Sequence, residues 1–257
     1  MDSDEETTAV VTGSSSGIGR AIAKRFGEEG LNVVTNSRSG ERANRIANEI
    51  IDHGGSAVGI EADVSDPEAA KSLIQGAVTE FGSVDILVNN AGHTVIGPAE
   101  EIDAEDWRSV LDVNTNGVFF CSQSAGKWMI DRGEGGHIIN ISSLLSEQGL
   151  AQRAPYCASK AAVNNLTKCL AVEWAEHAIH VNAIAPGFVK TNITEQTQAS
   201  AGYTDEDIEV RTPLGRFGSM EEITNVVVFL ANGNHYITGE VIHSDGGWRA
   251  NAWGTSQ

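Results

Sequence analysis

Short apolar runs alternate with longer amphipathic stretches along this chain, and this alternation constrains the fold more than any other feature. The short runs, which favour strands, are residues 8–12, 32–36, 57–61, 86–89, 137–142, 180–185 and 240–244. The stretches between them favour helices at residues 17–30, 41–53, 67–81, 103–132, 155–177 and 220–231. Short strands that alternate with helices predict an α/β fold: a doubly wound, seven-stranded parallel sheet with helices on both faces.

One domain accounts for the whole chain. The 257 residues include 40% hydrophobic and 20% charged residues, which is enough apolar material for a sizeable core. Doubly wound α/β domains commonly reach this length, and we find no linker and no internal repeat. We therefore expect a single domain over residues 1–257.

Several sequence features indicate where the protein resides. Cys121, Cys157 and Cys169 are odd in number and form no C-x-x-C pair, which is typical of a reducing compartment. The acidic start MDSDEE has no apolar run, and no stretch of about 18 apolar residues predicts a membrane span. The tract Glu173 to His180 lacks H-E-x-x-H order, so we predict no metal site. We expect a cytoplasmic protein that does not associate with membranes.

The charge balance is strongly acidic. The formal net charge is −18, from 35 acidic and 17 basic residues, and only six of the basic residues are lysines. Such a surface repels the phosphates of nucleic acids and anionic lipids, so neither is an expected partner. Carboxylate-rich, lysine-poor surfaces suit high salt, where repulsion is screened over roughly 3 Å at ~1 M. We hypothesise a halophilic protein; the alternative is an ordinary acidic cytosolic protein.

A glycine-rich loop follows the first predicted strand. The strand leads into Gly13-Ser14-Ser15-Ser16-Gly17-Ile18-Gly19, which opens the first predicted helix. A strand, a glycine loop and a helix in this order direct free N–H groups and the positive end of the helix dipole at an anion. Glycines also allow a pyrophosphate to approach the backbone closely. The loop predicts a dinucleotide site, although an ordinary tight turn is the alternative.

A hydroxyl, a phenol and an ammonium stand at useful spacings near the middle of the chain. Tyr156 and Lys160 lie four residues apart, on one face of a predicted helix, and Ser143 precedes them. A nearby ammonium favours the charged form of a phenol, so Lys160 is expected to lower the pKa of Tyr156 toward neutrality. The arrangement predicts acid/base chemistry at Tyr156 on an oxygen that Ser143 holds.

Together these motifs resemble the short-chain dehydrogenase/reductase family over about residues 8–248. The matching motifs, in family order, are Thr12 to Gly19, Asp63-Val64, Asn89-Asn90-Ala91-Gly92, Asn114 in DVNTNGVF, Ser143 in NISS, Tyr156-x-x-x-Lys160, Pro186-Gly187 with Thr191, and Asp245-Gly246-Gly247. Each cofactor or catalytic motif follows a predicted strand or faces its carboxyl end, where doubly wound sheets bind ligands. The resemblance implies a Rossmann-type fold, an NAD(P)-dependent oxidoreductase and a homotetramer.

The resemblance also implies roles for individual residues. The catalytic residues are expected to be Asn114, Ser143, Tyr156 and Lys160: Tyr156 exchanges a proton with the substrate, Ser143 binds the same oxygen, Lys160 also holds the nicotinamide ribose, and Asn114 holds a water that links Lys160 to solvent. The expected cofactor-binding residues are Gly13, Ser15, Ser16, Gly17, Ile18, Gly19, Arg38, Asp63, Val64, Asn90, Ala91, Gly92, Tyr156, Lys160, Pro186, Gly187, Val189 and Thr191.

The cofactor preference depends on the end of the second strand. The sequence there is Asn36-Ser37-Arg38-Ser39, with no carboxylate before Glu41 to bind a ribose 2′-hydroxyl. Arg38 can instead bind a 2′-phosphate, which favours NADP. Ser16 occupies a loop position that is basic in many NADP-dependent relatives, so NAD use and a merely solvated Arg38 stay open as alternatives.

The substrate is a small molecule whose identity the motifs do not define. Residues 188–220 form a long polar segment, expected to be a lid within the domain, and a polar lid suits a polar substrate. The expected substrate-binding residues are Ser143, Tyr156, His93, Gln148, Arg153 and Phe188. We favour a secondary alcohol or carbonyl of a sugar or polyol. The alternatives are a 3-oxoacyl thioester on a carrier protein and a dinucleotide-binding regulator without turnover.

Overall fold

The strands form a single sheet in which strands that are adjacent in space are not always consecutive in the chain. The computed structural model of the protein describes residues 7–190, 202–233 and 235–251. All strand pairs are parallel, in the order β3-β2-β1-β4-β5-β6-β7. The strands are β1 (Thr8–Val11), β2 (Asn32–Ser37), β3 (Ser56–Glu61), β4 (Ile86–Asn89), β5 (Gly136–Ile141), β6 (Ile179–Pro186) and β7 (Val241–Ser244). The predicted seven-stranded parallel sheet is confirmed, and each strand end lies within one residue of its expected position.

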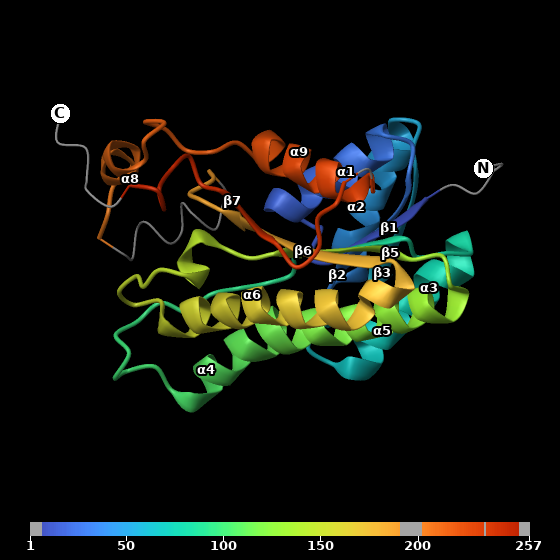
Figure 1. Ribbon diagram of the computed structural model, residues 1–257, viewed down its shortest axis with the longest axis horizontal. Helices are drawn as coiled ribbons and strands as arrows, with labels where there is room; N and C mark the ends of the chain where they lie inside the picture. The colour runs from blue at the N-terminus through green and yellow to red at the C-terminus, as the bar shows by residue number, and fades with distance from the viewer. Residues whose placement is uncertain (1–6, 191–201, 234, 252–257) are drawn as a thin grey trace.

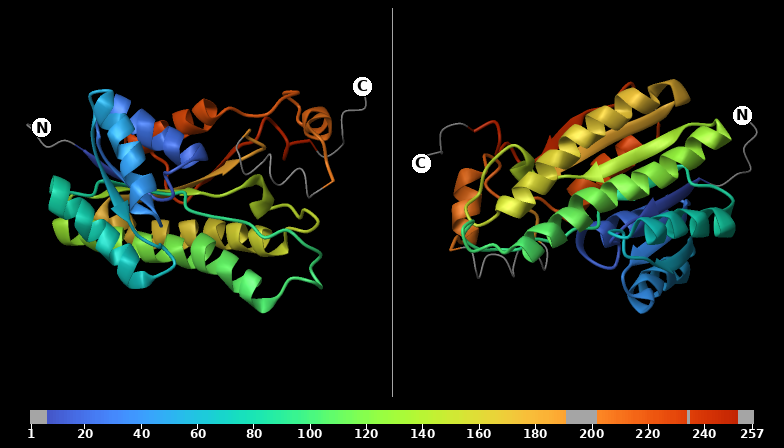
Figure 2. Two further views of the ribbon diagram at one scale, coloured as in Figure 1. Left: turned by 180° about the vertical axis from the view of Figure 1, so that it is seen from behind. Right: turned by 90° about the horizontal axis from the view of Figure 1, so that it is seen from below.

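Helices cover both faces of this sheet (Figure 1). One face carries α1 (Gly17–Glu28), α2 (Gly40–Asp52) and α9 (Met220–Ala231). The opposite face carries α3 (Pro67–Phe81), α5 (Gly117–Arg132) and α6 (Ala154–Trp174). Figure 2 shows the same three layers from behind and from below. The doubly wound arrangement is therefore confirmed.

The strands are apolar on both sides because each side packs against a helix layer. Ala9 and Val11 belong to the core that contains Phe26 of α1, whereas Val10 belongs to the core that contains Leu73 of α3. All five side chains are buried. Successive side chains of a strand point to opposite faces, so a central parallel strand is a nearly continuous apolar run. This is the pattern from which the strands were predicted.

One predicted helix differs in the structure. The expected helix over residues 103–132 consists of α4 (Ala104–Leu111), a π-helical turn (Asp112–Asn116) and α5. The turn contains Asn114, whose fully buried side chain hydrogen-bonds with the main chain of His93 and with Ser159. These are tertiary contacts, and π-helical turns of this kind are frequent at functional sites. Hydrophobic periodicity carries no signal for them.

The segment expected to be a lid contains a helix that was not predicted. The helix α8 (Asp205–Arg211) begins with a capping box, in which Thr204 and Asp207 each bond the main chain of the other. Ile208 of α8 packs in a small apolar cluster with Leu144 and Trp248. The T-x-x-D spacing is a recognisable helix start. The helix was missed because the segment contains too few apolar residues for hydrophobic periodicity to predict it. Residues 191–201 of this segment lie outside the described residues.

None of the described helices is long and apolar enough to cross a membrane.

Candidate active site

A cavity of about 470 Å³ lies at the carboxyl ends of the strands. The neighbours of β1 are β2 on one side and β4 on the other, so the chain winds away from this point in both directions. Ligands of open α/β sheets bind where the strand order reverses in this way. The cavity is lined by residues that follow each of the strands β1 to β6. Its volume lies in the range of small-molecule and cofactor sites.

Most residues predicted from the sequence line this one cavity. They are Gly13, Ser15, Ser16, Gly17, Ile18, Arg38, Asp63, Val64, Asn90, Ala91, Gly92, His93, Ser143, Arg153, Tyr156, Lys160, Pro186, Gly187, Phe188 and Val189. Gly19, Asn114 and Gln148 are not on its wall. Thr191 lies outside the described residues.

The glycine loop approaches the loop after β4 more closely than a side chain would allow. Gly13 has φ +60°, and a Cβ there would lie 2.7 Å from Ala91 Cα. A Cβ on Gly19 would lie 2.3 Å from the side-chain nitrogen of Asn90, so Gly19 serves close packing and does not line the cavity. Gly17, also at positive φ, has open space around its Cβ position at the start of α1. The loop therefore leaves room for a ligand at the helix N-terminus, and its residues fit a dinucleotide phosphate.

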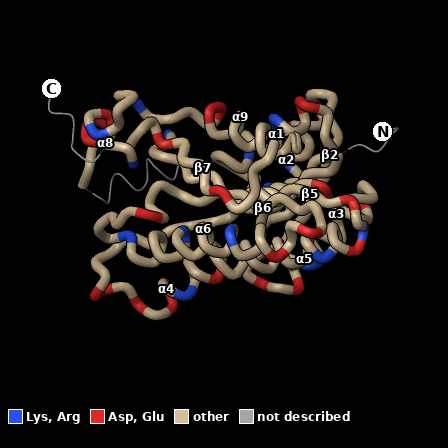
Figure 3. The backbone as a smooth tube through the Cα atoms, viewed as in Figure 1, with Lys and Arg blue, Asp and Glu red and all other residues tan. Residues whose placement is uncertain are grey.

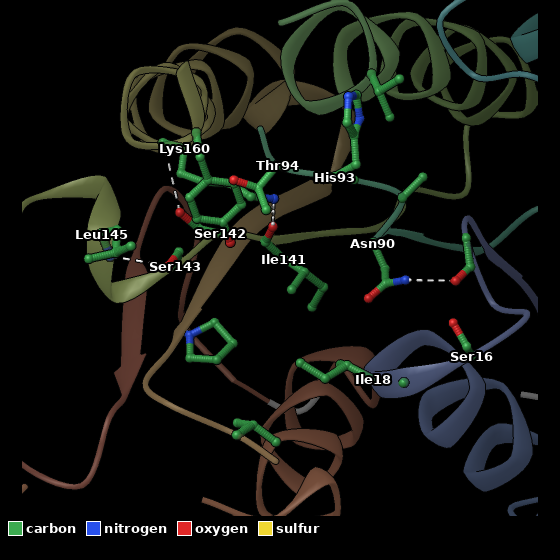
Figure 4. A pocket seen from close by; sticks show the side chains of 18 of the residues that line it. Ser16, Ile18, Asn90, His93, Thr94, Ile141, Ser142, Ser143, Leu145 and Lys160 are labelled. Carbon is green, nitrogen blue, oxygen red and sulfur yellow. Dashed lines mark hydrogen bonds between the residues drawn. The ribbon is translucent and has the colours of Figure 1, made fainter. Parts of the chain in front are cut away.

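Asn90 fixes the loop after β4 to the loop after β1. Its side-chain nitrogen donates to the carbonyls of Thr12 and Gly13, each at 3.0 Å, and Figure 4 shows this side chain reaching across. The hydroxyl of Thr12 accepts hydrogen bonds from the main-chain N–H groups of Asn90 and Ala91. The side-chain amide of Asn90, predicted to bind the cofactor, thus positions the glycine loop.

Two arginines stand at the end of the cavity beyond β2. Arg38 was predicted there. Arg42, in the first turn of α2, lines the same wall. Burial raises the pKa of the Asp63 carboxyl, but hydrogen bonds from Ser65 and the charge of Arg38 outweigh it, so the pKa is lowered overall. Asp63 is therefore charged at neutral pH. Arg42 was missed because the sequence motif ends at residue 39 and the first turn of α2 supplies the second cation.

Ser143, Tyr156 and Lys160 meet on the opposite wall. Ser143 precedes a single 3-10 turn (Leu144–Ser146), and its hydroxyl accepts a hydrogen bond from the N–H of Leu145 at 3.1 Å. Tyr156 and Lys160 lie one turn apart on α6. Figure 4 shows Ser143 and Lys160 on neighbouring elements, with Lys160 Nζ directed at the end of β5. The predicted constellation is thus assembled, and the roles of its members stay predictions.

Lys160 is a buried ammonium held by the main chain. Its side chain is 4% exposed, and Nζ donates to the carbonyl of Ile141 at 2.8 Å. Burial lowers its pKa to about 8. The Nζ atom lies 5.7 Å from the centre of the Tyr156 ring, at the outer limit of a cation–π contact.

The pKa of Tyr156 differs from the expectation. Burial, the largest cause, raises the pKa of Tyr156, and Cys157 raises it further. A hydrogen bond with Ser143 and the charge of Arg153 lower this pKa, but the net direction is upward. This net rise is opposite to the expected lowering, and the effect of Lys160 on Tyr156 in the ligand-bound site stays a prediction. The Lys160 ammonium donates to Ile141 and lies over the Tyr156 ring at 5.7 Å from its centre.

Asn114 supports the site from behind its wall. Its Oδ1 accepts from the N–H of His93 at 2.9 Å, and its Nδ2 donates to the His93 carbonyl and to the hydroxyl of Ser159. A Cβ on Gly92 would lie 3.1 Å from Asn114 Oδ1 and 3.7 Å from Lys160 Nζ, so the two side chains flank Gly92. Both hydrogens of the amide are used. The amide oxygen keeps one lone pair as the acceptor for the expected water between Asn114 and Lys160, which stays a prediction.

One of the six predicted substrate residues differs in placement. Arg153 and Phe188 line the cavity, and so does His93, whose pKa is lowered by burial and by the charge of Arg38. Gln148 instead accepts a hydrogen bond from the indole of Trp248 at 3.0 Å and is corrected to a structural position. The wall also contains residues that the motifs did not indicate: Thr94, Leu145, Leu150 and Tyr203.

Comparison with known proteins decides the family. The sequence profile described as enoyl-(acyl carrier protein) reductase matches residues 13–249. The chain belongs to the short-chain dehydrogenase/reductase family. As a member of this family it is an NAD(P)-dependent oxidoreductase, as the resemblance implied.

Relatives within the short-chain dehydrogenase/reductase family include enzymes of different substrates. The 3-oxoacyl-[acyl-carrier-protein] reductase of Staphylococcus aureus is 42% identical over 93% of this chain and 97% of its own. The 2-dehydro-3-deoxy-D-gluconate 5-dehydrogenase of Dickeya dadantii is 39% identical over 94% of this chain and 95% of its own. The crystal structure of a gluconate 5-dehydrogenase from Burkholderia cenocepacia, in complex with NADP and tartrate, has a TM-score of 0.91 and 34% identity over 96% of each chain.

Proposed function

We propose that this protein is an NADP-dependent dehydrogenase that interconverts a secondary alcohol and a ketone on a sugar-derived or polyol-like substrate. The observation that carries the proposal is the single cavity, which joins two arginines after β2 to the Ser143, Tyr156 and Lys160 group after β5. A dinucleotide spans such a distance along the carboxyl edge of the sheet. A non-catalytic regulator would not need all of the chemical side chains to face one space.

The two arginines support NADP over NAD. Arg38 and Arg42 line the end of the cavity next to β2, where the ribose of an adenosine lies in this fold. Neither has a carboxylate partner among the described ion pairs, and a guanidinium fork suits a phosphate. The related gluconate 5-dehydrogenase structure contains NADP. We therefore assign a 2′-phosphate to these two side chains.

The chain's own residues supply binding and proton transfer. When bound, the nicotinamide supplies the hydride acceptor or donor. The Tyr156 hydroxyl exchanges a proton with the substrate oxygen, and Ser143 hydrogen-bonds the same oxygen so that it stays within reach. Lys160, fixed on the Ile141 carbonyl, places a positive charge beside the ring of Tyr156 and offers its remaining donors to the nicotinamide ribose. Asn114 keeps the His93 segment against α6.

A sugar or polyol is favoured over a 3-oxoacyl thioester on an acyl carrier protein as substrate. The described wall near Ser143 combines apolar side chains with the polar side chains of His93 and Thr94, which suit hydroxyl groups. The acidic surface, with net charge −18, opposes the docking of an acidic carrier protein. Two relatives carry names of gluconate-type dehydrogenases. The carrier-linked 3-oxoacyl reduction is the second candidate, because the Staphylococcus aureus relative carries that name.

The experiment is a turnover assay that follows absorbance of the reduced nicotinamide. A panel of polyols, aldoses and aldonates would be offered with NADP or NAD, and 3-oxoacyl thioesters with the reduced cofactors. We expect turnover of a polyol, sugar or aldonate with NADP and a higher kcat/KM than with NAD. Turnover of the thioesters alone would favour the second candidate. Turnover of no substrate on the panel, with dinucleotide binding intact, would favour a regulator.

We also propose the homotetramer that the family resemblance implies. Apolar side chains are exposed on three helices: Trp107 on α4, Phe119 on α5 and Val172 on α6. Such side chains are commonly buried between subunits. Sedimentation should give four times the chain mass of 27.2 kDa, and Phe119→Glu should reduce that mass. A monomer in the unaltered protein would contradict the proposal. The cytoplasmic location stays a prediction.

A further inference from the structure

Arg153 is a buried cation without a counter-charge in the part of the chain that the structure describes. Its side chain is 4% exposed, and its Nη1 donates only to the carbonyl of Gln152, at 3.4 Å. Its Nη2 is buried and has no hydrogen-bond partner among the described residues. A guanidinium stays charged at all physiological pH values. A buried charge is costly unless something pairs with it, so this arrangement indicates a partner other than the described residues.

The other arginines show that the chain has ample carboxylates to offer. Arg20, Arg25, Arg45, Arg132, Arg216 and Arg249 each form an ion pair with a carboxylate. The sequence contains 35 acidic residues against 17 basic ones. Arg38 and Arg42 also have no described ion pair, but both are exposed, so an arginine that is unpaired and buried is specific to this position among the described residues.

The position of Arg153 connects it to the reacting groups. It precedes α6 directly, three residues before Tyr156, and lines the same cavity as Tyr156 and Ser143. Its main chain is fixed from both sides, because its N–H donates to Leu150 and its carbonyl accepts from Cys157. The preceding residue, Gln152, has φ +63°, a conformation that non-glycine residues seldom adopt and that clusters at functional sites.

The charge of the cavity wall is opposite to the charge of the protein. Among the described residues that line it, the charged side chains are the cations Arg38, Arg42, Arg153 and Lys160 and the carboxylate of Asp63. Arg38 and Arg42 stand at the end next to β2, which the proposed function assigns to the cofactor. Arg153 and Lys160 stand at the end next to β5 and α6, and Lys160 already bonds to Ile141. Arg153 is thus the cation that remains for the substrate.

We infer that Arg153 binds a carboxylate of the substrate, which makes the substrate a hydroxy or oxo acid and not a neutral polyol. This inference rests on the proposed function and narrows its substrate class. A carboxylate supplies two acceptor oxygens in one plane, which match the geometry of a guanidinium edge. The carboxylate is bound and not transformed. It orients the carbon chain so that an alcohol carbon further along faces Ser143 and Tyr156.

The test compares two substrates that differ only in this group. Gluconate and sorbitol share their remaining hydroxyl-bearing carbons, but sorbitol carries a neutral hydroxymethyl group in place of the carboxylate. For the unaltered protein, we expect kcat/KM to favour gluconate by about a hundredfold. Arg153→Met should lower the gluconate-to-sorbitol ratio by a similar factor, and Arg153→Lys should lower it less. Arg20→Met, which removes a surface pair with Glu49, is the matched control and should leave the ratio unchanged.

A second measurement separates binding from a structural role. Without ligand, Arg153→Met should have a Tm no lower than the unaltered protein, because it removes an unpaired buried charge. Tartrate, a dicarboxylate, should raise the Tm of the NADP-loaded unaltered protein and of Arg20→Met but not that of Arg153→Met. A lower Tm in Arg153→Met, together with equal loss of turnover on gluconate and sorbitol, would identify a structural residue and overturn the inference.

The remaining outcomes are also decisive. Glucose 6-phosphate tests whether the anion is a phosphate: a preference for it over gluconate, lost in Arg153→Met, would overturn the carboxylate assignment. Turnover of sorbitol and gluconate in a ratio that Arg153→Met does not change would overturn the inference and leave the proposed oxidoreductase intact. If no substrate is turned over, the proposed function fails, and the tartrate-dependent Tm shift still decides whether Arg153 binds a carboxylate.

Discussion

The ammonium of Lys160 lies 5.7 Å from the centre of the Tyr156 ring and donates its hydrogen bond to the main-chain carbonyl of Ile141 at 2.8 Å. The two side chains are therefore neighbours whose polar ends are turned toward different partners. The side chain of Tyr156 hydrogen-bonds with Ser143, and Lys160 is held by the Ile141 carbonyl at the end of β5. Burying this cation lowers the stability of the ligand-free protein. The same burial keeps a positive charge next to the phenol that is proposed to react.

The first prediction concerns the pH dependence of stability at Lys160. Burial lowers its pKa to about 8, against 10.5 for the model compound, so between these values the unfolded state binds more protons than the folded state. Stability should therefore rise with pH from about 8 to 10.5 by up to about 3 kcal/mol, with no contribution below the folded pKa. Lys160→Met should remove this rise in urea unfolding, measured without nucleotide. An unchanged slope in the variant would show that another group titrates.

The second prediction concerns the two arginines after β2. Arg38→Met should lower the ratio of kcat/KM for NADP to that for NAD by about ten- to a hundredfold, because a phosphate loses one charged hydrogen-bond donor. Arg42→Met should have a smaller effect in the same direction. Arg25→Met, on the outer side of α1 and paired with Glu29, is the control. A preference for NAD in the unaltered protein would overturn the assignment of a 2′-phosphate.

The third prediction concerns a histidine cluster near the amino ends of β5 and β6, whereas the cavity lies at the carboxyl ends of the strands. The rings of His137 and His180 stack at 5.1 Å, and His235 meets both at 5.8 and 5.3 Å. Burial, then the proximity of His180 and His235, lowers the pKa of His137 to about 4, and its Nδ1 is buried without a partner among the described residues.

Because the folded pKa lies below the unfolded value of 6.5, stability should fall as the pH drops from about 6.5 to 4, by up to about 3 kcal/mol in all. His137→Phe keeps the ring and removes the titrating group. Its unfolding free energy should fall less than that of the unaltered protein between these pH values. Equal losses in both proteins would contradict this origin of the acid sensitivity.

The fourth prediction concerns salt. Acidic residues occur on the helices of both outer layers (Figure 3), and the net charge is −18. If the protein is adapted to high salt, its Tm should rise steadily from low salt to about 1 M NaCl, as mutual repulsion is screened. Sucrose at equal osmolality is the control, because it screens no charge. A Tm that does not change over this range would contradict the halophilic hypothesis.

The fold was predictable from the sequence because its decisive signals are local. Each strand is a short apolar run, and the glycine loop marks the first crossover, so the order of elements and the parallel sheet followed. The π-helical turn at Asp112–Asn116 was not predictable, because it depends on bonds from Asn114 to His93 and Ser159, 21 and 45 residues away. The helix α8 was missed although Thr204 and Asp207 form a recognisable capping box.

The site was predictable as a set of residues and less so as a set of contacts. Motif positions placed Ser143, Tyr156 and Lys160 at one crevice, but the spacing of four residues does not reveal that Lys160 bonds to Ile141. Gln148 was wrongly expected on the wall, because its partner Trp248 lies 100 residues further along the chain. Sequence motifs likewise do not reveal whether Arg153 has a counter-charge, because that depends on which side chains the fold brings next to it.

The most direct test of the central claim is turnover by Tyr156→Phe, which removes the phenol oxygen and keeps the ring that Lys160 faces. We expect kcat to fall by about 10²–10⁴-fold, because the proton on the substrate oxygen then has no positioned partner. NADP binding, followed by fluorescence of the reduced form, and the Tm should stay near those of the unaltered protein. A variant that folds, binds NADP and turns over its substrate within about threefold of the unaltered rate would contradict proton transfer through Tyr156.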